Sequence, residues 1–255
     1  MKEDRDFVTA LARGIRVLRC FTAEHPELGT TQIAGLVGLP QSTVWRLCYT
    51  LQRMGLLVPG SEADKLRAGP GVLTLGQASV ASAGIAELAY RPMKEIADRF
   101  SVAVSLAAPS GTEMVVVQRA EAPTILRLAL NVGSTLSMAT SALGWAYLAG
   151  VSPEERRRVS ARLAKALGDA WPEAERKIEE ARQHYATHGF VVNLRHYHPD
   201  VNAIGVPVTA PGRRLAMALN SGGAVSMATV EKLRGPIAEE LKALAAQLSA
   251  LLPPD

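Results

Sequence analysis

Polar and basic side chains recur at helical spacing in the first quarter of the chain, and together they could bind a polyanion. They repeat every three or four positions from residue 41 onward, which places them on one face of a predicted helix. Groups of this kind form hydrogen bonds with phosphate oxygens and with base edges. The candidate DNA-contacting residues of this helix are Gln41, Ser42, Thr43, Trp45, Arg46, Tyr49, Thr50 and Arg53.

The charge of this region favours a DNA-contacting face over an ordinary solvated one. Residues 30–60 contain no Asp or Glu, whereas an exposed helix face usually carries acids as well as bases. Arg46 and Gln41 lie near the start of the helix, where base contacts are usually made. Lys65 and Arg67 follow on a predicted hairpin, from which they could reach the flanking phosphates.

Three helices and a hairpin must position this face. The sequence predicts helices over 8–18, 32–38 and 42–54, followed by two short strands within 56–68. A helix, a short connection, a second helix and a hairpin form a winged helix-turn-helix, which we assign to residues 1–75. Trp45 could pack between these helices or lie against sugar and phosphate, and both remain open. The apolar stripe of the first helix, predicted to be buried, is Val8, Leu11, Ile15 and Leu18.

The remaining chain changes its period twice. Residues 76–100 are rich in Ala and Ser at first and predict one long helix, or a helix broken before Pro92, which we interpret as a linker. Residues 101–255 alternate in the manner of antiparallel strands, then form three helical segments between 141 and 188, then strands again and a last helix over 230–252. The fold class is therefore α+β, with a second domain of the kind that folds around a small ligand.

Composition limits the classes of protein to consider. The chain has a net charge of +4 and 48% apolar residues, as expected for a globular protein with a modest basic excess. Its start, MKEDRD, is charged, and no apolar run is long enough for a membrane span. Cys20 and Cys48 lie in predicted helices and are interpreted as small hydrophobic residues of a reducing compartment. We expect a cytoplasmic protein with no membrane partner.

Across nearly its full length the chain resembles the IclR family of bacterial transcription regulators. The motifs that carry this resemblance are STVWRL, RMGLL and KLRAGPGVLTLG in the first domain, and ATSALGWAYLAG, HGFVVN, NAIGVPV and RRLAMALNSGG in the second. The resemblance implies a winged helix-turn-helix joined to an effector-binding domain related to the GAF and PAS sensor folds. It also implies a homodimer or a dimer of dimers on a palindromic, double-stranded operator. Whether the protein represses or activates stays open.

The start of the predicted helix at Ser141 is a candidate effector site. Free backbone N–H groups and the positive end of a helix dipole favour an anion there, although Ser141 could also be a simple cap. Thr140 adds a hydroxyl group, and Leu136 and Met138 could form an apolar wall. The resemblance adds further positions that match the family's pocket for a small organic or aromatic acid: Ala142, Leu143, Asp200, Asn202, Ala203 and Asn220.

Two departures from the family pattern bear on the effector. Arg195, His196 and His198 lie where the family has acids, which predicts a basic pocket mouth and an anionic effector held partly by these side chains. Trp145 lies where the family often has Lys or Arg, and it could favour an aromatic effector or belong to the core.

The histidines also suggest an alternative from another class. His184 and His188 are spaced i, i+4 on one predicted helix, and His196 and His198 follow; imidazoles at such spacing can bind zinc. A zinc-binding regulator or hydrolase is therefore the alternative, although helix-end histidines are more often solvated. The sequence contains no GxSxG, P-loop or GxGxxG motif, so we expect no enzymatic activity, no cofactor and no resident metal.

Overall fold

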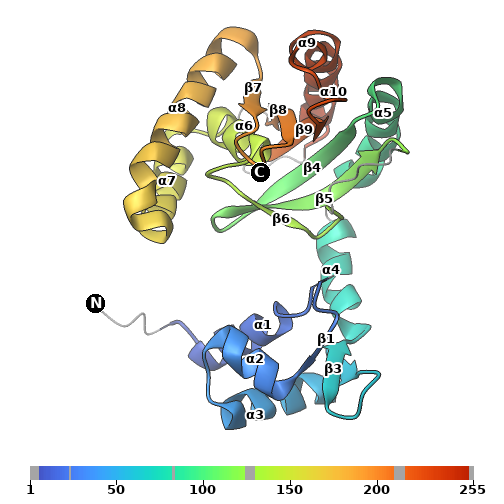
Figure 1. Ribbon diagram of the computed structural model, residues 1–255, viewed down its shortest axis with the longest axis vertical. Helices are drawn as coiled ribbons and strands as arrows, with labels where there is room; N and C mark the ends of the chain where they lie inside the picture. The colour runs from blue at the N-terminus through green and yellow to red at the C-terminus, as the bar shows by residue number, and fades with distance from the viewer. Residues whose placement is uncertain (1–5, 23, 82–83, 124–129, 210–215, 253–255) are drawn as a thin grey trace. The chain divides into compact units, whose positions relative to one another are not determined.

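The computed structural model describes residues 6–22, 24–81, 84–123, 130–209 and 216–252. Its contacts divide the chain into two compact units, Met1–Ser82 and Ala83–Asp255. Each unit has hydrophobic clusters of its own, and each is described here by itself (Figure 1).

The first unit packs three helices against a small sheet. Its elements in chain order are α1 (Thr9–Leu18), β1 (Glu27–Gly29), α2 (Thr30–Val37), α3 (Gln41–Arg53), β2 (Leu57–Pro59), β3 (Lys65–Ala68) and α4 (Gly71–Ala81). The strands pair antiparallel in the order β1-β3-β2. Val17, Ile33 and Val44 bring one fully buried side chain from each of the first three helices into a common core. This is a winged helix-turn-helix, as the sequence predicts.

The first helix differs from the expectation in the face that it buries. Of the apolar side chains near its start, Val8, Leu11 and Ile15 are exposed, at 63%, 64% and 45% of their surface. Val17 is the buried side chain of α1. The prediction that this stripe faces the core is therefore wrong for Val8, Leu11 and Ile15, whereas Leu18 is half-buried and packs against the core. Phe7, which is 61% exposed, extends the uncovered stripe.

The segment predicted as one linker helix forms two helices. Residues 71–81 are α4, and α5 spans Gly84–Phe100. Six side chains of α5 are buried, among them Ala89, Met93 and Ile96, and they belong to the core of the second unit. Most of the predicted linker is therefore an integral helix of that unit. Of the two alternatives, the break before Pro92 is absent, because α5 continues through this residue.

The second unit is built on a six-stranded antiparallel sheet. The strand order is β6-β5-β4-β9-β8-β7. Their bounds are β4 (Ala103–Ser110), β5 (Glu113–Glu121), β6 (Thr135–Ser137), β7 (Val191–Leu194), β8 (Val201–Val208) and β9 (Met217–Ala224). The third predicted strand, from Ile125, falls largely on residues 124–129, outside the described residues, as does the predicted turn at 211–212.

Helices cover both faces of this sheet, as the burial of alternate residues requires (Figure 1). One face packs against α5 and the C-terminal helices, around Leu106, Ile204 and Leu219. The other packs against the helices between β6 and β7, around Met114, Val116 and Ala218. The covering helices other than α5 are α6 (Ala142–Gly150), α7 (Pro153–Leu167), a 3-10 turn (Gly168–Ala170), α8 (Trp171–His188), α9 (Val230–Lys232), a π-helical turn (Leu233–Ile237) and α10 (Ala238–Ala250).

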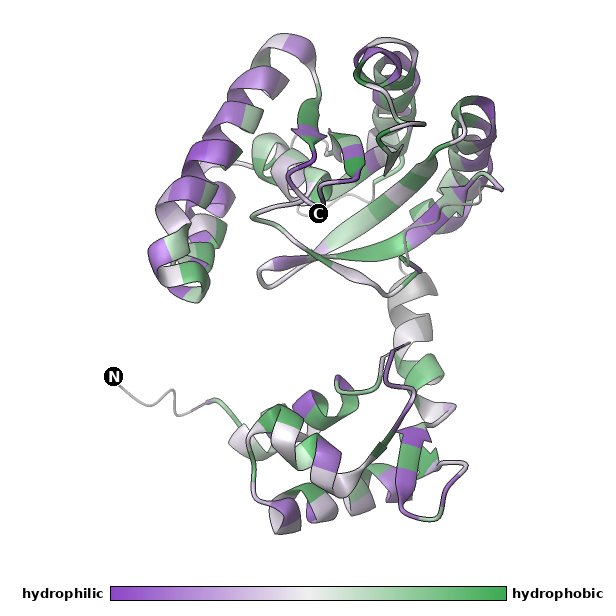
Figure 2. Ribbon diagram, viewed as in Figure 1, coloured by the Kyte–Doolittle hydropathy of each residue, from purple (hydrophilic) through white to green (hydrophobic). Residues whose placement is uncertain are grey.

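Hydropathy follows this layering. Figure 2 shows hydrophobic residues along the central strands, whereas α7 and α8 are largely hydrophilic. The kink expected at Pro236 is present, because Gly235 has non-helical dihedral angles inside the π-helical turn. Among the described residues, no helix combines the length and the apolar character needed to cross a membrane.

An irregularity in β5 determines which of its side chains face α6. Ala107 pairs with Val116, but its neighbour Leu106 pairs with Gln118, which leaves Val117 as an extra residue in a β-bulge. Directly opposite residues of an antiparallel pair point to the same face. Arg119 lies opposite Ser105, and Val116 lies opposite Ala107. Both therefore face α6, although regular alternation would separate residues 116 and 119.

Candidate DNA interface and ligand pocket

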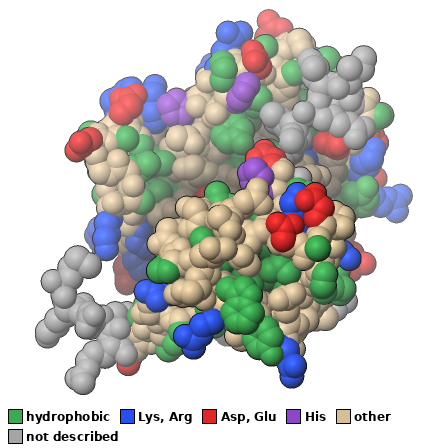
Figure 3. Space-filling model, turned by 60° about the horizontal axis from the view of Figure 1, so that its bottom comes forward, with side chains coloured by type: hydrophobic (Ala, Val, Ile, Leu, Met, Phe, Trp, Pro, Cys, Tyr) green, Lys and Arg blue, Asp and Glu red, His purple; other side chains and the backbone are tan. Residues whose placement is uncertain are grey.

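The predicted contact residues of α3 lie on the side of the helix away from the core. Val44, Cys48 and Leu51 are buried, and the residues between them are turned outward. The exposed members are Gln41, Ser42, Trp45, Arg46, Tyr49, Thr50 and Arg53, whereas Thr43 is half-buried. On the face shown in Figure 3, hydrophobic and basic side chains occur together in the lower part of the view. The structure thus brings the candidate residues together on one surface.

Some of these polar groups already have partners within the unit. The Gln41 side-chain amide donates a hydrogen bond to the Thr31 hydroxyl group at 2.8 Å, and the Thr50 hydroxyl group donates to the Arg46 carbonyl oxygen at 3.0 Å. The first bond ties α3 to α2, which supports the helix rather than leaving Gln41 free for a base. Within the described residues, the guanidinium groups of Arg46 and Arg53 have no hydrogen-bond or ion-pair partner.

Trp45 does not pack between the helices, so the first of its two predicted roles is excluded. Its side chain is 58% exposed, and that of Tyr49, one turn later, is 51% exposed. The two rings stack on each other, with centroids 5.6 Å apart and planes inclined by 12°. A nearly parallel pair of exposed aromatic rings therefore lies along α3.

The predicted wing is the β2–β3 hairpin. Lys65 forms an ion pair with Glu62 at 2.8 Å, while Arg67 is exposed on the same strand. Glu27 holds the turn in place, since its carboxylate accepts hydrogen bonds from the Ser61 backbone N–H and hydroxyl group. These bonds lower the pKa of Glu27. Arg67 is thus better placed than Lys65 to meet a phosphate.

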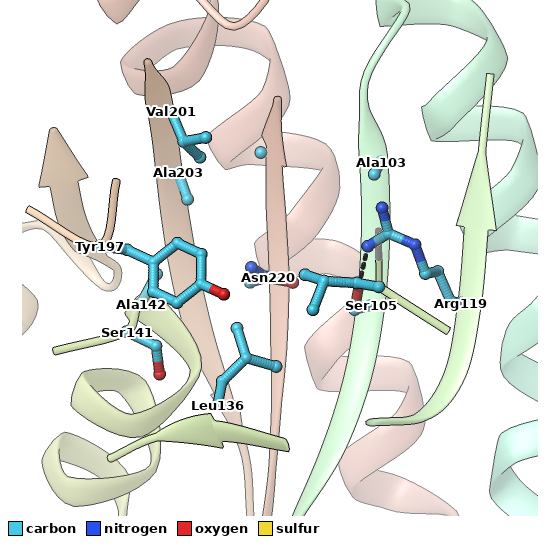
Figure 4. Close-up of a pocket in the computed structure, with 12 residues that line it drawn as sticks. Ala103, Ser105, Arg119, Leu136, Ser141, Ala142, Tyr197, Val201, Ala203 and Asn220 are labelled. Carbon is cyan, nitrogen blue, oxygen red and sulfur yellow. Dashed lines mark hydrogen bonds between the residues drawn. The ribbon is translucent and has the colours of Figure 1, made fainter. Parts of the chain in front are cut away.

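A small pocket lies on the α6 face of the sheet in the second unit (Figure 4). Its cavity measures about 30 Å³, which is room for about one water molecule. Strands β4, β5, β8 and β9, the start of α6 and a loop before β8 all contribute to its wall. The lining residues are Ala103, Ser105, Arg119, Leu130, Leu136, Ser141, Ala142, Tyr197, Val201, Ala203, Asn220 and Gly222.

Arg119 supplies the cationic group of the pocket, although it is not among the residues predicted from the sequence. Its side chain is 8% exposed and forms an ion pair with Glu121 at 3.3 Å. One guanidinium nitrogen donates to the Ser105 hydroxyl group at 2.9 Å (dashed in Figure 4). The Nε atom is buried without a hydrogen-bond partner among the residues that the structure describes. Burial lowers the pKa of Arg119, yet an arginine remains charged at any physiological pH.

Five of the predicted effector residues do line this pocket: Leu136, Ser141, Ala142, Ala203 and Asn220. The Ser141 hydroxyl group donates to the Ser137 carbonyl oxygen at 2.7 Å and accepts from the Gly144 N–H at 3.1 Å. Ser141 is therefore the N-cap of α6 as well as part of the wall. Met138 and Leu143 are buried in the adjoining core, and the Thr140 carbonyl oxygen accepts from the Asn193 side chain. That any of these residues binds an effector stays a prediction.

The basic residues expected at the pocket mouth lie elsewhere. Arg195, His196, His198 and Asp200 are exposed and do not line the cavity. They belong to a loop in which Arg195 has a left-handed backbone (φ 60°) and His198 accepts a hydrogen bond from the Asp200 N–H. The expectation is corrected accordingly: the cationic group is Arg119.

Asn202 also departs from the expectation. It follows Val201 and precedes Ala203, both of which face the pocket, so strand alternation turns its side chain to the opposite face. There it donates to the Ala228 carbonyl oxygen at 3.1 Å. The family pattern gives the right strand, but the pleat excludes this residue from the pocket.

Tyr197 is a second pocket residue that sequence reasoning missed. It comes from the same exposed loop, where its backbone N–H donates to the Asn193 side chain at 3.1 Å. Figure 4 shows its ring above Leu136, with the hydroxyl group directed toward Asn220. Because it lies between His196 and His198, the sequence indicated that its loop is near the pocket, but not that its own ring lines the pocket.

The four clustered histidines do not form a metal site in the part of the chain that the structure describes, where no group of three His, Cys, Asp or Glu residues could hold an ion. His184 and His188 stack with ring centroids 4.2 Å apart, and each donates a hydrogen bond from Nδ1 to a backbone carbonyl oxygen. His196 instead lies over Trp145, at 5.2 Å. Trp145 is 4% exposed and donates its Nε1–H to the Ala139 carbonyl oxygen, so it is a core residue.

A winged helix-turn-helix joined to a domain with a small, cation-bearing pocket defines a class: ligand-responsive DNA-binding regulators. Comparison with known proteins agrees with this class. Residues 10–60 match the IclR helix-turn-helix domain, and residues 77–250 match the bacterial transcriptional regulator IclR C-terminal domain. The chain therefore belongs to the IclR family of bacterial transcriptional regulators.

Individual relatives cover almost the whole chain. It is 30% identical over 245 residues to the HTH-type transcriptional regulator TsaQ1/TsaQ2 of Comamonas testosteroni, covering 95% of this chain and 88% of the relative. An IclR-family regulator from Brucella abortus shares its fold with a TM-score of 0.82 at 33% identity, over 98% of this chain and 95% of the other. An IclR homologue from Microbacterium hydrocarbonoxydans, solved in complex with 4-hydroxybenzoate, superposes with a TM-score of 0.74 at 21% identity, over 95% and 98%.

Proposed function

We propose that this regulator binds a palindromic operator as a homo-oligomer and that a small organic acid in the second unit changes its operator affinity. The observation that supports an acid as the effector is Arg119, whose buried guanidinium group lies on the wall of a small pocket. No catalytic step, cofactor or resident metal is part of the proposal. Since its operator is bacterial DNA, the chain acts in the cytoplasm.

The outer face of α3 is the proposed reading surface. Arg46 and Arg53 are exposed cations with no partner among the described residues, and arginine recognises guanine through two parallel hydrogen bonds. Ser42 and Thr43 lie at the helix start, where N–H groups can meet a phosphate. Arg67 on the wing is proposed to contact the flanking backbone, with Lys65 contributing less because it is paired with Glu62.

The uncovered apolar face of α1 supports a homo-oligomer. Phe7, Val8, Leu11 and Ile15 form a stripe that the first unit leaves in solvent. Contiguous exposed apolar surface of this kind usually marks an interface, and a palindromic operator requires two copies of α3. We propose that a second copy of the chain covers this stripe. Leu11→Glu should then lower the sedimentation coefficient and the operator affinity together. Leu88→Glu, at a similarly exposed position of α5, should change neither quantity.

The effector is proposed to be a monocarboxylic acid with a small apolar body. Arginine binds a carboxylate through directed, charge-assisted hydrogen bonds, and Nε of Arg119 has no hydrogen-bond partner among the described residues. Leu130, Leu136 and Val201 would contact the apolar body. An aromatic acid is the favoured example, because a homologue of this fold was solved with 4-hydroxybenzoate.

The test measures acid binding by calorimetry with benzoate, 4-hydroxybenzoate and pyruvate as probes. Arg119→Met keeps the volume of the side chain and removes its charge, so binding of the acid that the parent prefers should weaken about 100-fold. Arg195→Met, the matched control at the exposed loop position, should bind like the parent. Circular dichroism and retained operator binding confirm that the variants are folded. Equal binding by the parent and Arg119→Met would overturn the assignment of the anion to this pocket.

Coupling of the two units is proposed to run through the segment that joins them in sequence. Thermodynamic reciprocity requires operator DNA to change acid affinity by the same factor by which the acid changes operator affinity. Titrating the acid with and without operator, and then the operator with and without acid, therefore measures one coupling free energy twice. An acid that binds tightly but leaves operator affinity unchanged would show that it is not the effector.

A further inference from the structure

The stacked pair Trp45 and Tyr49 lies outside the hydrophobic cluster of the first unit. Both side chains project from the flank of α3, and more than half of each side chain is exposed. Exposing two large aromatic side chains to water costs free energy of hydration. Such exposure in a soluble domain usually marks a contact surface.

The surroundings of the pair indicate what it contacts. Trp45 and Tyr49 form one row along the helix, and Arg46, Thr50 and Arg53 form the row beside it. Because residues 30–60 contain no carboxylate, this mixed apolar and basic surface is complementary to a polyanion. A protein partner would have to be acidic and apolar at once, whereas the major groove of DNA offers both properties together.

The major groove has one apolar group on its base edges, the C5-methyl group of thymine. We infer that Trp45 and Tyr49 read thymine methyl groups, so that each operator half-site carries thymine beside the base that Arg46 contacts. The inference rests on the proposed operator binding and adds to it the kind of base that is recognised.

The geometry of the pair suits this contact. Its planes are inclined by 12°, so the two rings are already stacked on each other before DNA arrives. A surface that is ordered in the free protein loses little side-chain entropy on binding. Contact with a methyl group also buries part of the exposed ring area. The free energy gained for each thymine is about that of burying one methylene group.

The experiment first selects binding sites for the full-length protein from a pool of double-stranded DNA with a random core. Each thymine of the selected sequence is then replaced by deoxyuridine, which removes the methyl group and keeps the base-pairing edge. The parent should lose about fourfold in affinity at each contacted position. Trp45→Ala should bind the thymine and deoxyuridine forms equally at the position that Trp45 contacts and keep the preference for thymine at the position that Tyr49 contacts. Tyr90→Ala, which removes an exposed aromatic ring from α5, should behave like the parent.

The outcomes separate this inference from the proposal on which it rests. A defined selected sequence that is insensitive to deoxyuridine at every position would overturn the methyl readout and leave operator binding intact. Weaker binding by Trp45→Ala that keeps the parent's full preference for thymine over deoxyuridine at every position would assign the rings to sugar and phosphate instead. If no sequence is selected at all, both the operator proposal and this inference fail.

Discussion

On α3 the candidate contact residues lie in solvent, whereas in the second unit the candidate contact residues lie within the wall of a sheet. Arg46 is exposed on the helix surface, while the side chain of Arg119 is 8% exposed and shares hydrogen bonds with Ser105 and Glu121. The two arginines therefore differ in what holds them. Arg46 can adapt to its ligand, whereas Arg119 is fixed before any ligand arrives.

This difference separates two ways of recognising an anion. An exposed arginine keeps its water until DNA displaces it, and its contribution falls as salt rises. A buried arginine has already lost its water, so a carboxylate that reaches it is screened little by salt. The comparison predicts that substitutions in the pocket wall affect stability and ligand binding together, whereas substitutions on α3 affect DNA binding alone.

The largest expected effect comes from Gly144 in α6. A Cβ atom there would lie 2.2 Å from Cα and 2.4 Å from the carbonyl oxygen of Met138, and backbone cannot move aside cheaply. Gly144→Ala should lower the free energy of unfolding of the second unit by about 3 kcal/mol, measured by urea denaturation. Gly35→Ala is the control in α2, where an added Cβ meets nothing within 4 Å, and it should stabilise the first unit by up to about 1 kcal/mol. Similar changes in both variants would contradict the difference in packing.

Arg46→Ala tests the exposed side of the comparison. Loss of a two-bonded contact to a base should weaken operator binding by about 1–3 kcal/mol and leave acid binding unchanged. Fluorescence anisotropy with operator DNA and calorimetry with the acid measure the two quantities. Arg91→Ala, which removes an exposed arginine of α5, should alter neither. Operator binding by Arg46→Ala that equals the parent's would show that another face of α3 reads the bases.

Ser141→Ala tests whether the N-cap of α6 also serves the ligand. Loss of the bond from the Gly144 N–H to its hydroxyl group should cost about 1 kcal/mol of stability. Ser152 caps α7 in the same way, by accepting from the Glu155 N–H at 3.2 Å. Ser152→Ala should therefore show a similar loss of stability, measured by thermal unfolding. Acid affinity should fall a few-fold in Ser141→Ala only, and an equal affinity in both variants would leave Ser141 with the capping role alone.

The smallest expected effect belongs to Lys65 on the wing. If it contacts a phosphate, Lys65→Ala should reduce the slope of log affinity against log salt by about 0.9 for every DNA sequence alike. Its ion pair with Glu62 weakens the contact, so Arg67→Ala should reduce the slope more. The measurement is operator binding across a salt series, with Lys165→Ala in α7 as the control. A larger slope change for Lys65→Ala than for Arg67→Ala would mean that the Glu62 pair breaks on binding.

The helix-turn-helix could be predicted because helical periodicity separates its two faces. The buried residues Val44, Cys48 and Leu51 lie on one face of the helix, and Arg46, Tyr49 and Arg53 lie on another. The pattern within this short segment is therefore enough to predict both faces. The same reasoning failed for α1, where a clear apolar stripe is uncovered in the structure. Periodicity shows that a stripe will be buried, but it does not show whether the chain itself will bury it.

The pocket could be predicted only in part, because strand patterns in this unit are ambiguous. All eight residues of β8 are buried, so the sequence gives no alternation from which to exclude Asn202. In β5 the run of three valines conceals the bulge at Val117, and Arg119 therefore reads as an exposed strand residue. Ser141 and Asn220 were found through motifs, whereas Arg119 and Tyr197 depend on register and loop path, which only the three-dimensional structure provides.

The small volume of the pocket has a kinetic consequence. A cavity of about 30 Å³ admits no aromatic acid until the wall moves, and Tyr197 is the wall residue that comes from an exposed loop. If only a fraction of molecules is open, the apparent dissociation constant rises by the inverse of that fraction. Residues that hold the loop, such as Asn193, would then set how fast the sensor loads and at what concentration it responds, without touching the acid.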